Sequence, residues 1–136
     1  MALHQQTDTT RTLFTEYGED YVAVSGRRFQ QAVVVLPREV RTDWDATDFA
    51  SLSTAHFDYF LALKPEILLI GTGANQQFAR PDLYRELIRA KIGIEFMNTH
   101  AACRTYNILV AEDRNVVAAV LIKTRTKNHS WLTHLQ

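Results

Sequence analysis

The alternation of hydrophobic and polar residues is most regular in the second half of the chain, where it predicts a strand, a turn, a helix and another strand. The apolar run Ile67–Ile70 is typical of a strand that is covered on both faces, and it ends at Gly71–Gly73. The two glycines of this turn allow a positive φ or the close approach of another group. Pro81 suits the first turn of the next helix, and after Gly93 a strand over residues 94–97 completes a βαβ unit.

A second helix is expected to follow this strand, with Asn98 or Thr99 as its N-cap. Apolar residues at helical spacing form its buried stripe: Ala102, Cys103, Tyr106, Leu109 and Val110. The other side carries His100, Arg104 and Asn107. Ligand sites in open α/β sheets form at the carboxyl ends of the strands, so we expect the glycine turn and the start of this helix to lie there together.

The flanking regions predict further strands and one more helix. Leu13–Tyr17, Tyr21–Val24 and Phe29–Leu36 have the composition of short strands separated by turns, which indicates an antiparallel meander. Val33–Leu36 is apolar on both faces and is expected to enter the main sheet, with Tyr21 and Arg28 at its rim.

Residues 38–45 have the composition of a polar loop, in which Trp44 is expected to cover the core. A helix capped at Thr47 or Asp48 should then extend to about Leu63, and residues 116–122 should form another buried strand. The predicted fold class is therefore α/β: a single domain with a mixed β-sheet, βαβ units, three flanking helices and an N-terminal antiparallel β-meander.

Composition limits the classes of function. The chain has 136 residues and a formal net charge of zero, which predicts one domain and gives no reason to expect nucleic-acid binding. Its single cysteine excludes an intrachain disulfide and a four-cysteine zinc site. Because no membrane-spanning run or signal peptide is evident, we expect a soluble cytoplasmic protein that does not insert into membranes. Residues 1–10 are expected to be a mobile tail, 11–122 the domain, and 123–136 a basic tail.

Several of these segments together resemble a known family. They are the glycine turn Gly71–Gly73, Phe78, Pro81, the strand Gly93–Met97 and above all the run Ala101–Asn107, which reads Ala-Ala-Cys-Arg-Thr-Tyr-Asn. Over residues 11–122 the chain resembles a family of small α/β domains of unknown function from bacteria and archaea, whose mitochondrial relative is an assembly factor for respiratory complex I. The resemblance implies an assembly role with protein partners. The chain itself is expected to be a monomer or a weak homodimer.

The chain departs from the family pattern at two positions near the expected site. Asn98 and His100 stand where the family usually has an aspartate and a glycine. A carboxylate role is therefore not expected at position 98, and any role of His100 would be specific to this protein.

A pocket is expected at the carboxyl ends of the two parallel strands. Its predicted residues are Gly71, Thr72, Gly73, Phe78, Thr99, Arg104, Thr105 and Asn107. Arg104 would either bind a carboxylate or phosphate with its planar fork, or brace the helix against a strand carbonyl or Glu95. A dinucleotide site is not predicted, because Gln76 occupies the position of the third glycine in that fingerprint, and no cofactor is expected.

Cys103 has two interpretations. At the start of a helix, with His100 three residues earlier, it could be a nucleophile whose pKa is lowered by the helix dipole. Free cysteine is also among the most frequently buried residue types, and we favour this interpretation. No metal site is expected, since His129 and His134 have no cysteine or carboxylate cluster near them.

These observations favour a non-enzymatic domain for protein interaction or assembly. The alternative is a protein that binds a small molecule or anion, or an enzyme, using the pocket at the glycine turn and Arg104. An enzymatic activity is the less favoured of the two classes, because no catalytic constellation is evident.

Overall fold

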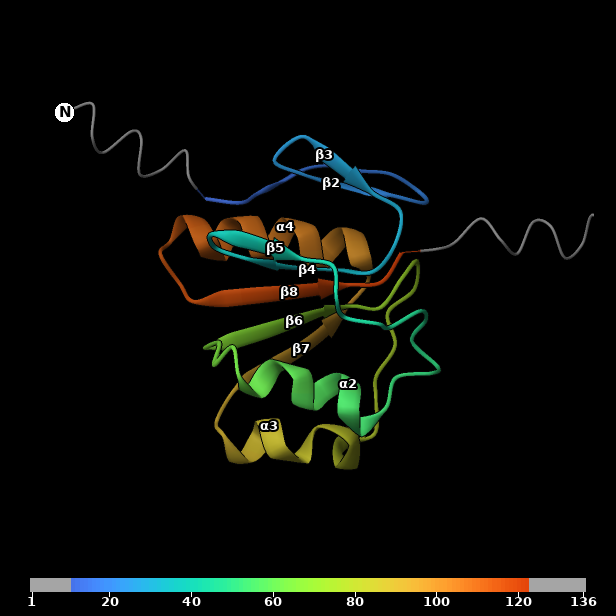
Figure 1. Cartoon of the computed structure of the whole chain (residues 1–136), viewed down its shortest axis with the longest axis vertical. Helices are drawn as coiled ribbons and strands as arrows, with labels where there is room; N and C mark the ends of the chain where they lie inside the picture. Colours follow the sequence, from blue (N-terminus) through green and yellow to red (C-terminus); the bar gives the residue numbers. More distant parts are fainter. Residues whose placement is uncertain (1–10, 123–136) are drawn as a thin grey trace, which may run out of the picture.

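The strands of the molecule form two sheets, which enclose a helix between them (Figure 1). The computed structural model describes residues 11–122, so both predicted tails, residues 1–10 and 123–136, lie outside the described part. The strands are β1 (Phe14–Tyr17), β2 (Val22–Val24), β3 (Arg27–Phe29), β4 (Val33–Leu36), β5 (Glu39–Arg41), β6 (Ile67–Gly71), β7 (Gly93–Met97) and β8 (Val116–Val120). The helical segments are α2 (Thr54–Asp58) with the 3₁₀ turn η1 (Tyr59–Leu61), the 3₁₀ turn η2 (Pro81–Tyr84) with α3 (Arg85–Arg89), and α4 (Thr99–Ala111).

The main sheet is mixed and has the strand order β5-β4-β8-β6-β7. β6 lies between β7 and β8 and is parallel to both, whereas β4 is antiparallel to β8 and to β5. The pairing of Gly71 with Met97 brings the carboxyl ends of β6 and β7 to the same edge. The chain leaves β6 for the glycine turn and leaves β7 for α4, so both segments begin side by side.

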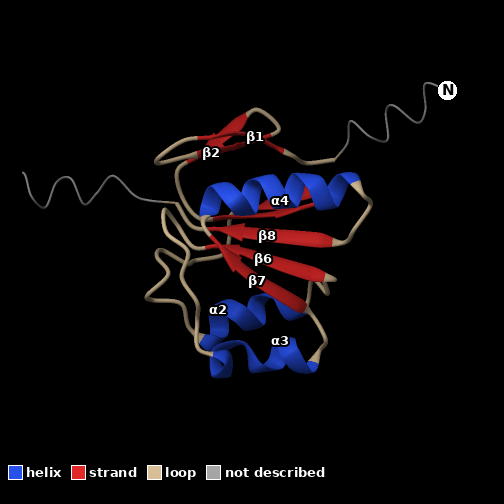
Figure 2. Ribbon diagram, turned by 180° about the vertical axis from the view of Figure 1, so that it is seen from behind, coloured by secondary structure: helices blue, strands red, loops and turns tan. Residues whose placement is uncertain are grey.

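The helix α4 lies on one face of the main sheet and the helices α2 and α3 lie on the other (Figure 2). Alternate side chains of the central strands enter two separate hydrophobic cores, one on each face. Leu69 and Ala118 face α4, while Leu68, Ile70 and Val117 face α2 and α3. We call the first the α4 core; it is built around Phe14, Val22, Val24, Val33, Val35, Leu69, Ala102, Cys103, Tyr106, Val110, Val116, Ala118, Val120 and Ile122. The second, the aromatic core, contains Val34, Trp44, Ala46, Leu52, Phe57, Phe60, Leu68, Ile70, Leu87, Ile92, Phe96, Val117, Ala119 and Leu121.

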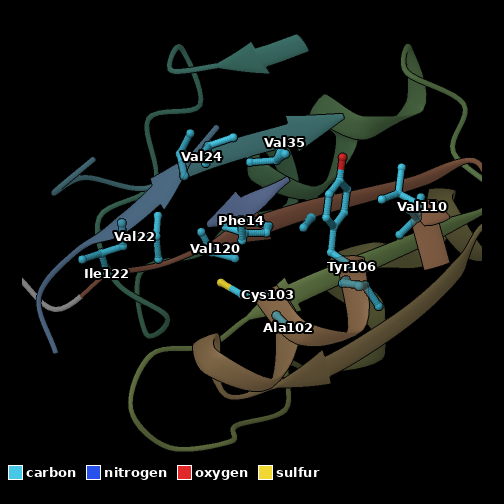
Figure 3. Packing of buried hydrophobic residues seen from close by; sticks show 14 residues of the cluster. Phe14, Val22, Val24, Val35, Ala102, Cys103, Tyr106, Val110, Val120 and Ile122 are labelled. Atoms are coloured by element: carbon cyan, nitrogen blue, oxygen red, sulfur yellow. The ribbon is translucent and has the colours of Figure 1, made fainter. Parts of the chain in front are cut away.

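The small antiparallel sheet β1-β2-β3 covers the outer side of α4, which therefore has apolar neighbours on two sides (Figure 3). Asn107 fixes β1 to this helix: its Nδ2 donates to the Phe14 carbonyl at 2.8 Å, and its Oδ1 accepts from the Phe14 amide at 3.0 Å. The Tyr106 hydroxyl donates to the Thr12 carbonyl at 3.0 Å. The small sheet thus closes the α4 core instead of extending the main sheet.

The predicted fold class is confirmed: the chain has a mixed sheet, βαβ units, three helical segments and an N-terminal antiparallel meander. One detail was wrong, because Phe29–Leu36 is not a single strand. Its beginning belongs to β3 of the small sheet and its end is β4 of the main sheet. The arginines of β3 remain exposed, while Val33, Val34 and Val35 are fully buried, so the two halves need different environments.

Two further differences concern the segment after β4. Residues 39–41 form the edge strand β5, where a loop was predicted. Edge strands often carry charged residues such as Glu39 and Arg41, so β5 lacks the apolar pattern from which a strand is predicted. The next helix begins at Thr54 and its N-cap is Ser53, not Thr47 or Asp48 as predicted. Ser53 caps it together with His56, whereas the Asp48 carboxylate accepts from the Ser51 amide at 3.0 Å in a separate turn.

Trp44 covers the aromatic core, as the sequence predicts for a tryptophan in this segment. Its side chain is buried, and its Nε1 donates to the His56 carbonyl at 3.0 Å. The His56 ring lies at the edge of the same core, where Nδ1 accepts from the Ser53 amide and Nε2 lies 2.9 Å from Asp45. Both ring nitrogens are therefore engaged in holding the segment before α2.

Candidate functional site

A cavity of about 500 Å³ lies at the carboxyl edge of the main sheet, beside the start of α4. We call it the α4 cavity. Four segments line it: the turn between β1 and β2, the glycine turn after β6, the first part of α4, and the residues that follow β8. The lining residues are Gly18, Glu19, Tyr21, Gly73, Ala74, Asn98, Thr99, His100, Arg104, Leu121 and Ile122. Its volume falls within the range of small-molecule sites, roughly 300–1,000 Å³.

The glycine turn is held against the start of α4 by backbone and side-chain bonds. The Thr99 amide donates to the Gly73 carbonyl at 2.8 Å, and the Gly73 amide donates to Thr99 Oγ1 at 2.9 Å. Gly73 has a φ of 104°, which favours glycine. Gly71 is needed for a different reason: a Cβ there would lie 3.1 Å from the Thr99 Cα and 3.0 Å from a Val120 methyl carbon.

Asn98 caps α4 by accepting hydrogen bonds from backbone amides of the first turn. Its Oδ1 accepts from the Ala101 amide at 2.8 Å, and its backbone carbonyl accepts from the Ala102 amide at 2.9 Å. With the Thr99 amide bound to Gly73, three amides of this turn are already satisfied within the chain. The helix start is therefore not an open cradle for phosphate.

His100 and Arg104 form the α4 side of the cavity, and Arg104 supplies its positive charge. They are four residues apart on α4, so their side chains lie on one face of the helix. His100 Nε2 lies 2.9 Å from the Gly18 carbonyl, which requires a proton on this nitrogen, and the ring contacts Tyr17 at 4.9 Å between centroids. Arg104 is exposed, and neither a strand carbonyl nor Glu95 forms a bond with it in the described part of the chain. The brace that was one interpretation of Arg104 is not present there.

The predicted pocket residues separate into three groups. Gly73, Thr99 and Arg104 line the α4 cavity. Gly71, Thr72 and Asn107 have internal contacts that position the chain around it. Phe78 and Thr105 lie outside the lining, and Phe78 is instead on the surface at a different place.

Phe78 is exposed over 71% of its surface, more than any other large hydrophobic residue between 11 and 122. Its ring contacts Phe96 at 6.1 Å between centroids. Phe96 belongs to the aromatic core and is also in ring contact with Phe49, Phe57 and Tyr84. Phe78 is therefore the outward end of a packed aromatic cluster.

Thr72 organises the loop that carries Phe78. The buried Thr72 hydroxyl donates to the Asn75 carbonyl at 2.6 Å and accepts from the Gln77 amide at 3.2 Å. The Gln76 side chain donates to the Phe96 carbonyl at 2.8 Å. We call residues 72–78 the Phe78 loop; its bonds fix the backbone on which the exposed ring is presented.

Cys103 lies inside the α4 core, with its side chain among the residues shown in Figure 3. Burial raises the pKa of its thiol to about 12, and the positive charge of Arg104 offsets this only in part. A catalytic thiol needs the opposite shift and access to a substrate. The geometry thus favours the interpretation of Cys103 as a core residue.

The residues of the α4 cavity that the sequence did not predict come from distant segments. Gly18 and Glu19 belong to the turn after β1, and Leu121 and Ile122 follow β8. Tyr21 was expected at the rim of the main sheet; its ring lies under the Arg28 guanidinium at 4.2 Å and it also lines the cavity. No local pattern could indicate these neighbours, because only the packing of the small sheet on α4 brings them together.

Between residues 11 and 122, no group of three or more histidine, cysteine, aspartate or glutamate side chains is arranged to hold a metal ion. Among the helices described there, none has the length and apolar character needed to span a membrane. His129 and His134 lie outside the described residues.

Comparison with known proteins places these features in a wider context. A family model described as "Protein of unknown function (DUF498/DUF598)" matches residues 14–121. A Francisella tularensis subsp. holarctica protein named "13 kDa major membrane protein" is 30% identical over 122 residues, which cover 89% of this chain and 99% of that protein.

Similarity extends to eukaryotic proteins and to solved structures. A Danio rerio protein named "NADH dehydrogenase (ubiquinone) 1 alpha subcomplex assembly factor 3" is 26% identical over 123 residues, covering 89% of this chain and 70% of that protein. A crystal structure of a Bordetella parapertussis protein matches with a TM-score of 0.79 and 37% identity, covering 84% of this chain and 98% of that one.

Proposed function

This chain belongs to the DUF498/DUF598 family, and on that premise we propose that it is an assembly-factor-like protein that binds a partner protein through the Phe78 loop. Its relative from Danio rerio carries the name of an NADH dehydrogenase assembly factor. We therefore propose subunits of a membrane-bound NADH dehydrogenase as the partner, bound in the cytoplasm before or during their assembly. The ligand is an apolar segment of such a subunit that is not yet covered by its neighbours.

The observation that carries this proposal is the exposed and anchored ring of Phe78. Its side chain is 71% exposed, which leaves most of the ring available for a partner, and the ring packs against Phe96 of the aromatic core. Aromatic residues dominate the binding energy of many protein interfaces, where they insert into pockets of the partner. A single exposed aromatic residue in a flexible loop would bind less well, because its ordering would oppose association.

The hydrogen bonds of the Phe78 loop remove much of that entropic cost. Thr72 bonds to both Asn75 and Gln77, and Gln76 bonds to the backbone of β7 at Phe96. These bonds hold the backbone that leads to Phe78 in place before any partner binds. The contacts of the ring then contribute to affinity, because little free energy is needed to order the loop on binding.

Capture of the partner from the protein's own cells tests the proposal. The tagged chain would be cross-linked in those cells, purified, and its partners identified by quantitative mass spectrometry. We expect NADH dehydrogenase subunits to be recovered with the wild-type chain and reduced about tenfold or more with Phe78→Ala, the loss expected for an interface hot spot.

Ile108→Ala is the matched control, because Ile108 is 59% exposed but lies on α4, across the sheet from the aromatic core. It should retain the partner at the wild-type level. The proposal fails if no NADH dehydrogenase subunit is enriched, or if Phe78→Ala and Ile108→Ala recover the same amount. A Phe78→Trp variant should keep part of the binding, since it retains an exposed aromatic ring.

A further inference from the structure

We infer that the α4 cavity is a binding site for a small carboxylic acid with an apolar body. The inference is independent of partner binding, because Phe78 does not line this cavity. Its basis is the chemistry of the lining: a cationic guanidinium on α4, a helix start whose amides are mostly used internally, and an apolar wall at the end of β8.

Arg104 provides the charge that the ligand must match. It makes no hydrogen bond or ion pair with any residue of the described part, and it faces a cavity of about 500 Å³. Most other arginines there are paired with carboxylates: Arg11 with Asp113, Arg28 with Glu16, Arg41 with Glu39, Arg80 with Asp82, Arg89 with Glu86 and Arg114 with Glu66. The fork of a guanidinium matches the two oxygens of a carboxylate in a planar pair of bonds.

The neighbouring groups favour a carboxylate over a phosphate. Of the amides in the first turn of α4, only that of His100 has no acceptor within residues 11–122. A phosphate dianion would need several such donors. A singly charged carboxylate needs fewer donors, and the two parallel N–H groups of the Arg104 fork supply them.

The other side of the α4 cavity suits an apolar ligand body. Leu121 and Ile122 extend from β8 into the lining, and Ala74 adds a methyl group from the glycine turn. The Tyr21 ring supplies an aromatic wall that is fixed by its packing against Gly18, where an added Cβ would lie 2.2 Å from the ring. A short alkyl chain or aromatic ring would displace water from these surfaces while its carboxylate contacts Arg104.

Protein-observed NMR titration with hexanoate and benzoate tests this site in the full chain. We expect the amide signals of Gly73, Ala74 and His100 to shift, while those of the Phe78 loop beyond Ala74 remain in place. Hexanamide, which has the same body without the charge, and inorganic phosphate, which has the charge without the body, are the comparison ligands. Both should bind at least about tenfold more weakly than hexanoate.

Variants separate the role of Arg104 from general effects of charge. Arg104→Ala should weaken hexanoate binding by about 10- to 100-fold, and Arg104→Lys should recover only part of it, because the ammonium lacks the planar fork. Arg85→Ala is the matched control, since Arg85 is another exposed arginine that has no carboxylate partner within residues 11–122, but it lies on α3 and does not line the cavity. It should bind hexanoate as the wild type does.

The inference is overturned if neither acid shifts the cavity signals, if Arg104→Ala binds hexanoate normally, or if phosphate or hexanamide binds as well as hexanoate. These outcomes leave the proposed function untouched. Conversely, Phe78→Ala should lose the protein partner and keep hexanoate binding, so the two proposals fail separately.

Discussion

The two cores of this protein differ in how they meet the surface. The α4 core is enclosed by the main sheet on one side and the small sheet on the other, and hydrogen bonds from Tyr106 and Asn107 hold the small sheet in place. The aromatic core is covered by short helices, and its ring contacts continue through Phe96 to the exposed Phe78. The aromatic core therefore reaches the surface through the exposed Phe78 ring, whereas the α4 core is enclosed and the α4 cavity lies beside it at the sheet edge.

The largest effect should come from the accessibility of Cys103 in the enclosed core. Because burial raises the pKa of its thiol from 9.0 to about 12, its thiolate population near neutral pH is lowered by about a thousandfold. Iodoacetamide should therefore modify the native protein at least that much more slowly than the urea-unfolded chain. Mass spectrometry of timed samples measures both rates.

The pH dependence of alkylation shows whether folding raises or lowers the pKa of the Cys103 thiol. Between pH 7 and 9 the unfolded chain should react progressively faster as its thiol ionises, while the folded protein stays slow because its thiol remains protonated. Rapid alkylation of the native protein at pH 7 would contradict an enclosed α4 core and support the nucleophile interpretation of Cys103.

Removal of the Tyr106 ring should produce the largest loss of stability. Tyr106 is fully buried and packs edge-on against Phe14, with 5.4 Å between centroids. Tyr106→Ala should lower the free energy of unfolding by about 3–5 kcal/mol in urea titrations, as large-to-small substitutions of aromatic core residues do. Tyr106→Phe keeps the ring and loses only the hydroxyl contacts with the Thr12 carbonyl and side chain, so it should cost about 1 kcal/mol. Equal losses in both variants would argue against ring packing as the main contribution.

Asn107 tests the attachment of the small sheet. Asn107→Ala removes both bonds to the Phe14 backbone and should lower the free energy of unfolding by about 1–3 kcal/mol. Hydrogen exchange of the β1 and β2 amides should become faster before that of β6. Thr105→Ala, on the same helix, is the control and should change stability by less than about 0.5 kcal/mol. Uniform acceleration of exchange throughout the protein would show that the small sheet is not a separately attached layer.

The smallest effect on stability is expected on the aromatic side. Phe78 already exposes 71% of its surface, so Phe78→Ala should change the free energy of unfolding by less than about 0.5 kcal/mol. The same substitution should nevertheless remove partner capture. A loss of several kcal/mol would mean that the ring mainly covers the core, and the contrast between the two sides would disappear.

Sequence patterns were sufficient for the parallel strands of the main sheet and for α4, because these elements have strong local signals. The apolar run before Gly71, the proline at the start of η2 and the Asn98 cap each fix a local structure without distant contacts. The patterns failed for β5 and for the division between β3 and β4. In those places, pairing partners far along the chain determine whether a segment forms a strand.

The predicted pocket was also only partly correct, because contacts between distant segments decide which residues line it. Gly73, Thr99 and Arg104 were recognised as neighbours because parallel strands bring their carboxyl ends to one edge. The sequence also placed Phe78 in that pocket, although its loop turns toward β7 and packs on Phe96. Loop direction depends on which backbone groups accept bonds from Thr72 and Gln76, and these partners exist only in the folded chain.

The sequence alone determined the α/β class, the βαβ order and the family to which the chain belongs, because these depend on hydrophobic periodicity, caps and a distinctive local run. The tertiary structure decided where the small sheet packs, which residues enclose the α4 cavity and that Phe78 faces solvent. Packing between layers depends on side chains that are far apart in the sequence and become neighbours only when the apolar faces are buried together. Glu19 and Ile122 meet Arg104 at one cavity for that reason.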